Sequence, residues 1–315
     1  MKALVTGVAG FVGSHLAATL LAERRAVVGV DCFTDYYPRP VKEANLSTLI
    51  GQPGFQFVEA RLQEADLGIL LDGVTHVFHL AAQAGVRKSW GADFAVYTSN
   101  NIEATQKLLE ASVGHPLERF VYASSSSVYG DHVALPMRED AYLQPLSPYG
   151  VSKLAAEHLA SLYWENHGVP AVSVRYFTVY GPRQRPDMGF HRFFRAALEG
   201  LPVTVYGDGE QTRDFTFVAD AVAATRAAGL IGRPGGVYNV GGGSRVTVNQ
   251  VLDLIGRVSG RPIEIRRASP QKGDVRHTYA DTTKARDELG FNPLVKLEEG
   301  LRQQFQWQQA APRQV

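Results

Sequence analysis

A glycine-rich turn near the N-terminus constrains the fold of this chain more than any other feature. A short apolar strand runs into Gly7, Gly10 and Gly13, and a helical pattern that includes Phe11 and Leu16 follows at once. Glycines allow a tight turn and a close approach of the backbone to a pyrophosphate, and the helix N-terminus supplies N–H donors and positive potential. The turn therefore predicts a βαβ unit that binds a nucleotide.

A second apolar strand, at 26–30, ends on Asp31. This is about the place where an acidic residue accepts a hydrogen bond from an adenosine ribose. The same carboxylate would repel a 2′-phosphate, and the next residue, Cys32, offers no cation. The pattern favours NAD over NADP, with an ordinary turn residue at a strand end as the alternative for Asp31.

Strand and helix patterns alternate through the first half of the chain. Strands are expected at 3–6, 26–30, 55–58, 75–80, 119–124 and 170–176, and helices at about 11–24, 93–113 and 149–167. Repeated βαβ units predict an α/β fold, a Rossmann-type doubly wound parallel sheet with helices on both faces.

The second half of the chain predicts a smaller, mixed α/β substrate-binding domain. We expect residues 1–176 to form the nucleotide-binding domain, with a return near 214–240, and residues 177–213 and 241–315 to form the second domain. The segment around Pro182 and Pro186 is rich in cations and cannot be a regular helix, which indicates a substrate lid. Residues after Leu301 indicate a polar tail.

The pair Tyr149 and Lys153 is the strongest catalytic signal. Residues four apart share one face of a helix. A tyrosine with a pKa of roughly 10 is a poor base at neutral pH, and an adjacent ammonium favours its ionised form. Alone, the pair is common on solvated helix faces. Together with the glycine turn and the serine run at 124–127, it predicts a catalytic base.

Composition excludes several other classes of protein. The 315 residues suffice for two lobes, and a net charge of +1 gives no basic field for nucleic acid or an anionic membrane. The single cysteine excludes an internal disulfide, and no Cys/His spacing resembles a metal site. No segment resembles a signal peptide or reaches membrane-spanning length. We expect a cytoplasmic protein with no metal, no nucleic-acid partner and no membrane partner.

Seven short motifs follow one another along nearly the whole chain. They are TGVAGFVGSH at 6–15, HLAA at 79–82, SSSSVYG at 124–130, YGVSK at 149–153, RYF at 175–177, YGDGEQTRD at 206–214 and YNVGG at 238–242. In this order they resemble the extended short-chain dehydrogenases that epimerise or dehydrate nucleotide sugars with NAD. The resemblance implies a tightly held NAD, a transient 4-keto sugar, and a homodimer formed through the helices near 93–113 and 149–167.

The resemblance also implies roles for individual residues. Ser125 would pair with Tyr149 at the sugar O4, and Lys153 would bind the nicotinamide ribose. Arg61 stands where the family usually has an aspartate near the adenine, and it can stack on that ring instead. Asn100 competes with Asn101 for one position. The cofactor contacts expected are Gly7, Gly10, Phe11, Val12, Gly13, Asp31, Arg61, Leu62, Leu80, Ala81, Ala82, Gln83, Asn101, Tyr149, Lys153, Tyr176 and Phe177.

Three positions distinguish among the activities of this family. Dehydratases carry an Asp-Glu pair where this chain has Ser126 and Ser127, which cannot act as a carboxylic acid and base. UDP-glucuronate decarboxylases carry a glutamate at the position of Ser127. UDP-glucose 4-epimerases typically have asparagine at the position of Thr178. The motifs that resemble UDP-glucuronate 4-epimerases lie at 35–37, 81–87, 178–182, 185–188 and 271–275.

The expected substrate contacts follow from the same resemblance. They are Arg87, Ser126, Ser127, Thr178, Arg185, Met188, Tyr206, Arg213, Gln271 and Asp274. Arg185 and the hydroxyls would bind a sugar carboxylate, although a loop cap or a phosphate ligand is the alternative for Arg185. Arg213 is expected at the pyrophosphate, and Tyr206 at the uracil.

The predicted activity is NAD-dependent 4-epimerisation of a UDP-sugar, with UDP-glucuronate converted to UDP-galacturonate. The nearest alternative is a 4-epimerase of UDP-glucose or UDP-N-acetylglucosamine. Decarboxylation of UDP-glucuronate and a non-catalytic NAD-binding sensor are the remaining hypotheses.

Overall fold

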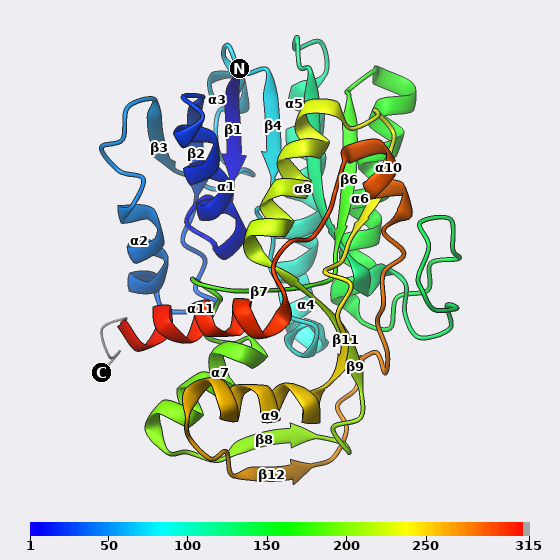
Figure 1. Cartoon of the computed structure of the whole chain (residues 1–315). Helices are drawn as coiled ribbons and strands as arrows, with labels where there is room; N and C mark the ends of the chain where they lie inside the picture. Colours follow the sequence, from blue (N-terminus) through cyan, green and yellow to red (C-terminus); the bar gives the residue numbers. More distant parts are fainter. Residues whose placement is uncertain (311–315) are drawn as a thin grey trace.

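Seven parallel strands form the main sheet (Figure 1). The structure, a computed structural model, describes residues 1–310. The strands are β1 (Lys2–Thr6), β2 (Ala26–Asp31), β3 (Phe55–Glu59), β4 (His76–His79), β5 (Arg119–Ser125), β6 (Ala171–Tyr176) and β10 (Val237–Val240). Their spatial order is β10-β6-β5-β4-β1-β2-β3, so the chain reverses direction across the sheet between β1 and β4. Ligands of such sheets bind outside the carboxyl ends of the strands at this switch point.

Helices cover both faces of the sheet, which is why its strands are almost continuously apolar. Along β1, Ala3 and Val5 join one buried cluster while Leu4 joins the other. The first face carries α1 (Phe11–Ala22) and α8 (Val218–Ile231). The other helices around this lobe are α2 (Arg39–Ser47), α3 (Leu67–Leu71), α4 (Phe94–Tyr97), α5 (Ala104–Ser112) and α6 (Pro148–His167).

A second, smaller lobe lies below the carboxyl ends of the sheet in Figure 1. It contains α7 (Gly189–Glu199), α9 (Val248–Ser259) and the parallel pair β8 (Val203–Tyr206) and β12 (Ile265–Ala268). A three-stranded sheet of β7 (Thr178–Tyr180), β9 (Thr212–Phe217) and β11 (Arg245–Thr247) joins the lobes. Between them crosses α11 (Leu297–Ala310), so the predicted polar tail is helical as far as residue 310.

The structure confirms the predicted fold class and all six predicted strands to within about two residues at each end. The predicted helix at 93–113 is interrupted by a π-helical segment, Thr98–Glu103. Helix α10 (Thr283–Leu289), from the predicted second domain, packs on α8 and β10. The domain boundaries stay a prediction.

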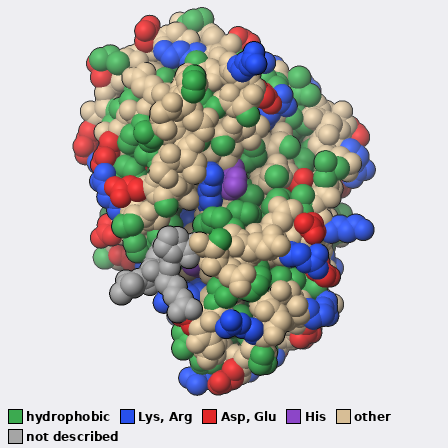
Figure 2. All heavy atoms as spheres, turned by 60° about the vertical axis from the view of Figure 1, so that its left-hand side comes forward, with side chains coloured by type: hydrophobic (Ala, Val, Ile, Leu, Met, Phe, Trp, Pro, Cys, Tyr) green, Lys and Arg blue, Asp and Glu red, His purple; other side chains and the backbone are tan. Residues whose placement is uncertain are grey.

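The surface carries mixed charge. Figure 2 shows basic and acidic side chains interspersed over one face of the molecule. Among residues 1–310, none of the helices combines the length and the apolarity that a membrane crossing requires.

Candidate active site

The glycine turn lies between β1 and α1 and leaves no room for side chains. Gly7 has a φ of +70°, in the left-handed region that favours glycine. A Cβ at Gly13 would come within 2.2 Å of the Gly7 carbonyl oxygen. Helix α1 starts after Gly10 without a side-chain cap from any described residue and without an acidic residue in its first turn. Its first N–H groups are therefore able to donate to a phosphate.

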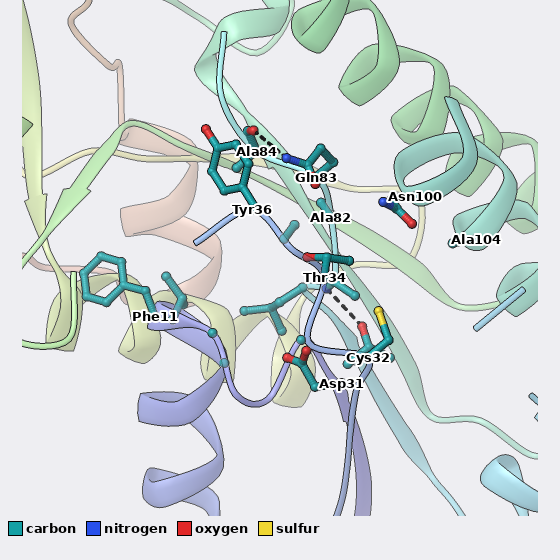
Figure 3. Close-up of a pocket in the computed structure, with 18 of the residues that line it drawn as sticks. Phe11, Asp31, Cys32, Thr34, Tyr36, Ala82, Gln83, Ala84, Asn100 and Ala104 are labelled. Atoms are coloured by element: carbon teal, nitrogen blue, oxygen red, sulfur yellow. Dashed lines mark hydrogen bonds between the residues drawn. The ribbon is translucent and has the colours of Figure 1, made fainter. Parts of the chain in front are cut away.

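A cavity opens from this turn along the switch point of the sheet (Figure 3). Asp31, the last residue of β2, and Thr34, which follows that strand, lie on one side of it, and Ala82 and Gln83, after β4, lie on another. The predicted cofactor contacts that line the cavity are Gly7, Gly10, Phe11, Val12, Gly13, Asp31, Leu62, Leu80, Ala81, Ala82, Gln83, Tyr149, Lys153 and Tyr176. A glycine turn at one end and Tyr149 and Lys153 at the other fit an elongated dinucleotide such as NAD.

The carboxylate of Asp31 is held by backbone donors. It accepts hydrogen bonds from the N–H groups of Ala9 (3.1 Å) and Phe33 (2.9 Å). Burial raises the pKa of Asp31, while these bonds and the nearby Lys42 ammonium lower it. Two carboxylate oxygens can accept further hydrogen bonds, so a ribose diol remains compatible with this arrangement. Lys42, which was not predicted from the sequence, lines the same cavity.

Three predicted cofactor contacts lie outside this cavity. Arg61 points to solvent and pairs with Glu64, which leaves the adenine contact without support. Phe177 directly follows β6 and is buried in a separate apolar cluster. Asn101 is buried, and its side chain makes two hydrogen bonds with the Gln83 backbone. It accepts from the Gln83 N–H at 2.7 Å and donates to the Gln83 carbonyl oxygen at 3.0 Å.

The cavity-lining asparagine is Asn100, the alternative at that position. Both asparagines lie in the π-helical segment, and π-bulges often occur at functional sites. The Asn101 side chain also donates to the Ser152 hydroxyl on α6 at 2.9 Å. Asn101 therefore joins the cavity wall to the helix that carries Tyr149.

Tyr149 is the second residue of α6, and its position is fixed by the start of that helix. The Ser147 hydroxyl caps α6 by accepting from the Gly150 N–H at 3.1 Å, and Pro148 occupies the first turn. Burial raises the pKa of Tyr149, whereas a hydrogen bond with Ser125 and the charge of Arg185 lower it. The positive end of a helix also favours a phenolate.

Lys153 is buried one turn further along α6. Its ammonium lies 4.6 Å from the centroid of the Tyr122 ring. Burial lowers the pKa of Lys153 to about 7, and the carboxylate of Glu157 opposes that shift. The sequence predicts that Lys153 brings the pKa of Tyr149 below its ordinary value. In the structure, burial of the phenol raises the pKa of Tyr149 by more than Ser125 and Arg185 lower it.

A second cavity continues from the first toward the smaller lobe. The predicted substrate contacts that line it are Arg87, Ser126, Ser127, Thr178, Tyr206, Arg213 and Asp274. Two cations absent from the prediction, Lys88 and Arg192, line it as well. Four cations along one cavity suit a diphosphate. Met188 packs toward the core and Gln271 is exposed, so neither lines this cavity.

Several of these side chains already contact each other. The Arg87 guanidinium pairs with Asp274 at 2.7 Å and stacks 4.3 Å from the centroid of the Tyr206 ring. Arg213 donates to the carbonyl oxygens of Thr212 and Arg276, at 2.9 and 3.2 Å. Burial lowers the pKa of Arg213.

Arg185 lines the first cavity and acts electrostatically on Tyr149. Its Nε lies 3.0 Å from Asp187 Oδ1, and its Nη2 lies 3.2 Å from Asp187 Oδ2. The Tyr36 hydroxyl donates to Asp187 as well, at 3.3 Å. Asp187 and Tyr36 line the second cavity, so this cluster lies where the two cavities meet. The sequence predicts Arg185 in the site, whereas its partner Asp187 is apparent only from the structure.

Within residues 1–310, no group of three or more His, Cys, Asp or Glu side chains is placed to hold a metal ion.

Comparisons with known proteins agree with this geometry. A model of the NAD dependent epimerase/dehydratase family matches residues 3–241. A protein of Bacillus subtilis (strain 168) named an uncharacterized UDP-glucose epimerase is 45% identical over 305 residues, covering 96% of either chain. The UDP-glucuronate 4-epimerase of Thermodesulfobacterium geofontis (strain OPF15) is 37% identical over 311 residues, covering 96% of this chain and 95% of that protein.

A solved structure is also very similar. It is the UDP-glucuronic acid 4-epimerase of Bacillus cereus in complex with UDP-glucuronic acid and NAD. The two chains are 43% identical, the TM-score is 0.96, and the match covers 98% of this chain and 99% of that one.

A parallel sheet that places a glycine turn opposite a Tyr-Lys pair defines an enzyme of the short-chain dehydrogenase class. The family model spans most of that sheet, from β1 to the residue after β10. This chain belongs to the NAD-dependent epimerase/dehydratase family.

Proposed function

We propose that this protein is an NAD-dependent UDP-sugar 4-epimerase whose preferred substrate is UDP-glucuronate, which it converts to UDP-galacturonate. The observation that supports this proposal most is the position of Arg185. Its guanidinium lines the cavity that contains Tyr149, while Ser126, Ser127 and Thr178 line the adjoining one. A sugar with O4 at Tyr149 would therefore have a cation and three hydroxyls near its C5 substituent.

The reaction needs a base for the sugar O4 and a hydride acceptor for C4. We assign the base to Tyr149, with the Ser125 hydroxyl stabilising charge at O4. The cavity between the glycine turn and Lys153 would hold NAD, which would supply reversible hydride transfer at C4. Tyr149 then gives the proton back to O4, so the net reaction inverts C4 without net oxidation.

The 4-keto form of a uronic acid is a β-keto acid, which is prone to lose carbon dioxide. Loss of carbon dioxide requires the carboxylate charge to move into the ring. Hydrogen bonds from Arg185, Thr178 and Ser127 would hold that charge on the carboxylate and oppose decarboxylation. Ser127 is also where decarboxylases carry a glutamate.

We assign the remaining roles by cavity. Arg213, Lys88 and Arg192 would bind the diphosphate, and Asp274 would accept from the uridine. The Tyr206 ring is covered by Arg87, so stacking on uracil would require Arg87 to move. Cytoplasmic location stays a prediction.

A 4-epimerase of UDP-glucose is the second candidate function, and one observation favours it. Arg185 is paired with Asp187, so its charge is partly balanced before any substrate binds. The test is to measure kcat/KM for UDP-glucuronate and UDP-glucose in separate incubations, with product analysis by NMR. We expect higher kcat/KM with UDP-glucuronate. A preference for UDP-glucose would make the second candidate the correct one.

Replacing Glu157 should change the pH dependence of turnover. Glu157 is buried, accepts from Arg175 Nη2 at 2.6 Å, and raises the pKa of Lys153. Glu157→Gln removes that negative charge, so Lys153 loses its proton at lower pH. If turnover needs charged Lys153, the alkaline limb of kcat against pH should move down by about one pH unit.

Glu165→Gln, an exposed change on the same helix, is the control for this experiment. The Glu157 variant also leaves Arg175 without its anion, so we expect it to unfold at lower temperature. If the variant unfolds at lower temperature but the alkaline limb of kcat against pH does not move, the role of Glu157 is structural only.

We also propose that the protein forms a homodimer through α4 and α6. Val151 and Leu162 on α6 are exposed, and at eleven residues apart they lie about three turns along one face. Val96 on α4 is exposed too. Leu162→Asp should convert a dimer to a monomer in light scattering at micromolar concentration, while Leu201→Asp, exposed in the smaller lobe, should not. A monomeric wild-type protein in that range would refute the dimer.

A further inference from the structure

The loop that carries Arg185 is held from outside the active site by a buried glutamine on α11. Gln304 has no solvent-exposed surface. Its side-chain oxygen accepts from the Gly181 N–H at 2.9 Å, and its amide nitrogen donates to the Gln184 side-chain oxygen at 2.8 Å. Gly181 and Gln184 are the fourth and the first residue before Arg185.

Gln184 extends this contact to both ends of the loop. It is 1% exposed, and its side-chain nitrogen donates to the Val179 carbonyl oxygen at 3.2 Å. Its side-chain oxygen also accepts from the His191 N–H, at the start of α7, at 2.9 Å. The two buried side-chain amides of Gln184 and Gln304 thus bond to strand β7, to the loop and to helix α7.

The loop backbone needs such support. Gly181 has a φ of +138°, and Arg183 has a φ of +64°, which is strained for a residue with a side chain. On the opposite side, the neutral ring of His15 on α1 donates to the Pro182 carbonyl oxygen at 3.0 Å. Burial lowers the pKa of His15 to about 4, which keeps the ring neutral near pH 7. The loop is therefore fixed between the helix that follows the glycine turn and α11.

We propose that Gln304 is a positioning residue that sets where the Arg185 guanidinium lies, and so sets the preference for an anionic sugar. This inference rests on the proposed function. Gln304 lines neither cavity and does not belong to the catalytic machinery. It acts through Gly181 and Gln184 on the backbone that carries Arg185.

A purely structural role would have a different signature from a positioning role. If Gln304 only attached α11 to the protein, its loss would lower the unfolding temperature and reduce turnover of every substrate alike. If it positions Arg185, the loss should concentrate on the substrate whose charge Arg185 binds, and it should depend on Arg185 being present.

The variants follow from the contacts. Gln304→Met keeps the length of the side chain and removes both hydrogen bonds. Gln304→Glu keeps an acceptor for the Gly181 N–H but loses the donor to Gln184. Gln306→Met is the matched control, because Gln306 is exposed on the same helix and its side chain makes no hydrogen bond within residues 1–310. Each variant is purified as the holoenzyme and assayed on UDP-glucuronate and UDP-glucose, alone and combined with Arg185→Ala.

We expect Gln304→Met to lower kcat/KM for UDP-glucuronate by roughly tenfold and to change that for UDP-glucose by less than about twofold. In the Arg185→Ala background it should have no further effect on UDP-glucuronate. If the methionine variant does not fold, Gln304→Glu should show the same selectivity with a smaller loss. Gln306→Met should match the wild type.

Two results would overturn the inference. One is an equal loss of kcat/KM on both sugars in Gln304→Met. The other is a double variant in which the fold-losses of Gln304→Met and Arg185→Ala multiply, which would show that the two residues act independently. A failure of the proposed function is distinguishable, because it shows in the wild type as absent or non-preferred turnover of UDP-glucuronate.

Discussion

Replacing Tyr149 with phenylalanine should abolish measurable epimerisation while NAD stays bound. The substitution removes one hydroxyl and leaves the ring, which packs edge-on against Tyr97 at a centroid distance of 6.2 Å. Loss of a general base typically costs about 10²–10⁴-fold in rate. The measurement is turnover of UDP-glucuronate by NMR, together with the NAD content of the purified variant.

Tyr163→Phe is the matched control, since it removes a hydroxyl from the same helix away from the cavities. It should keep most of the activity. Near wild-type turnover by the Tyr149 variant would show that the base is wrongly assigned. Loss of NAD together with activity would mean that Tyr149 chiefly supports cofactor binding.

Replacing Arg185 with alanine should separate the two candidate sugars. The Arg185 side chain is 23% exposed and lines the same cavity as Tyr149, so a carboxylate bound there would be largely desolvated. Truncating one partner of a buried ion pair leaves the other charge unpaired. We expect kcat/KM for UDP-glucuronate to fall by about two orders of magnitude or more, which is about 3 kcal/mol. Activity on UDP-glucose should fall much less, because that sugar has no charge to lose a partner and is affected only through the pKa of Tyr149.

Arg195→Ala removes a similar cation from the exposed side of α7, where it pairs with Glu199, and serves as the control. It should leave both substrates unaffected. An equal loss of kcat/KM on both sugars with Arg185→Ala would indicate that Arg185 binds the diphosphate instead of the sugar carboxylate. The neutral-sugar 4-epimerase would then be the better description of the protein.

The sheet and most of the cofactor cavity were predictable because local patterns determine them. Short, almost continuous apolar runs predict the strands, and a glycine turn between β1 and α1 needs no distant contact to form. Tyr149 and Lys153 are placed by one helix whose cap, Ser147, is also local. Residues that follow a strand or start a helix are thus readable from sequence.

Residues whose role depends on distant contacts were not predictable in the same way. Gln304 lies in a polar run that resembles a tail. The fold nevertheless buries it against Gln184, which is 120 residues away in the sequence. Asp187 gains its role only by facing Arg185 and Tyr36. Conversely, Arg61 and Gln271 were predicted at the cofactor and the substrate from their places in the sequence, but both are exposed to solvent.

The most direct test of the proposed activity uses UDP-glucuronate labelled with deuterium at C4. The protein is incubated as purified, without added NAD, and the product is analysed by NMR. If C4 is inverted through a hydride held by bound NAD, the product is UDP-galacturonate that keeps deuterium at C4, with no pentose formed. Loss of the deuterium to water, or a decarboxylated pentose as the main product, would contradict 4-epimerisation by this protein.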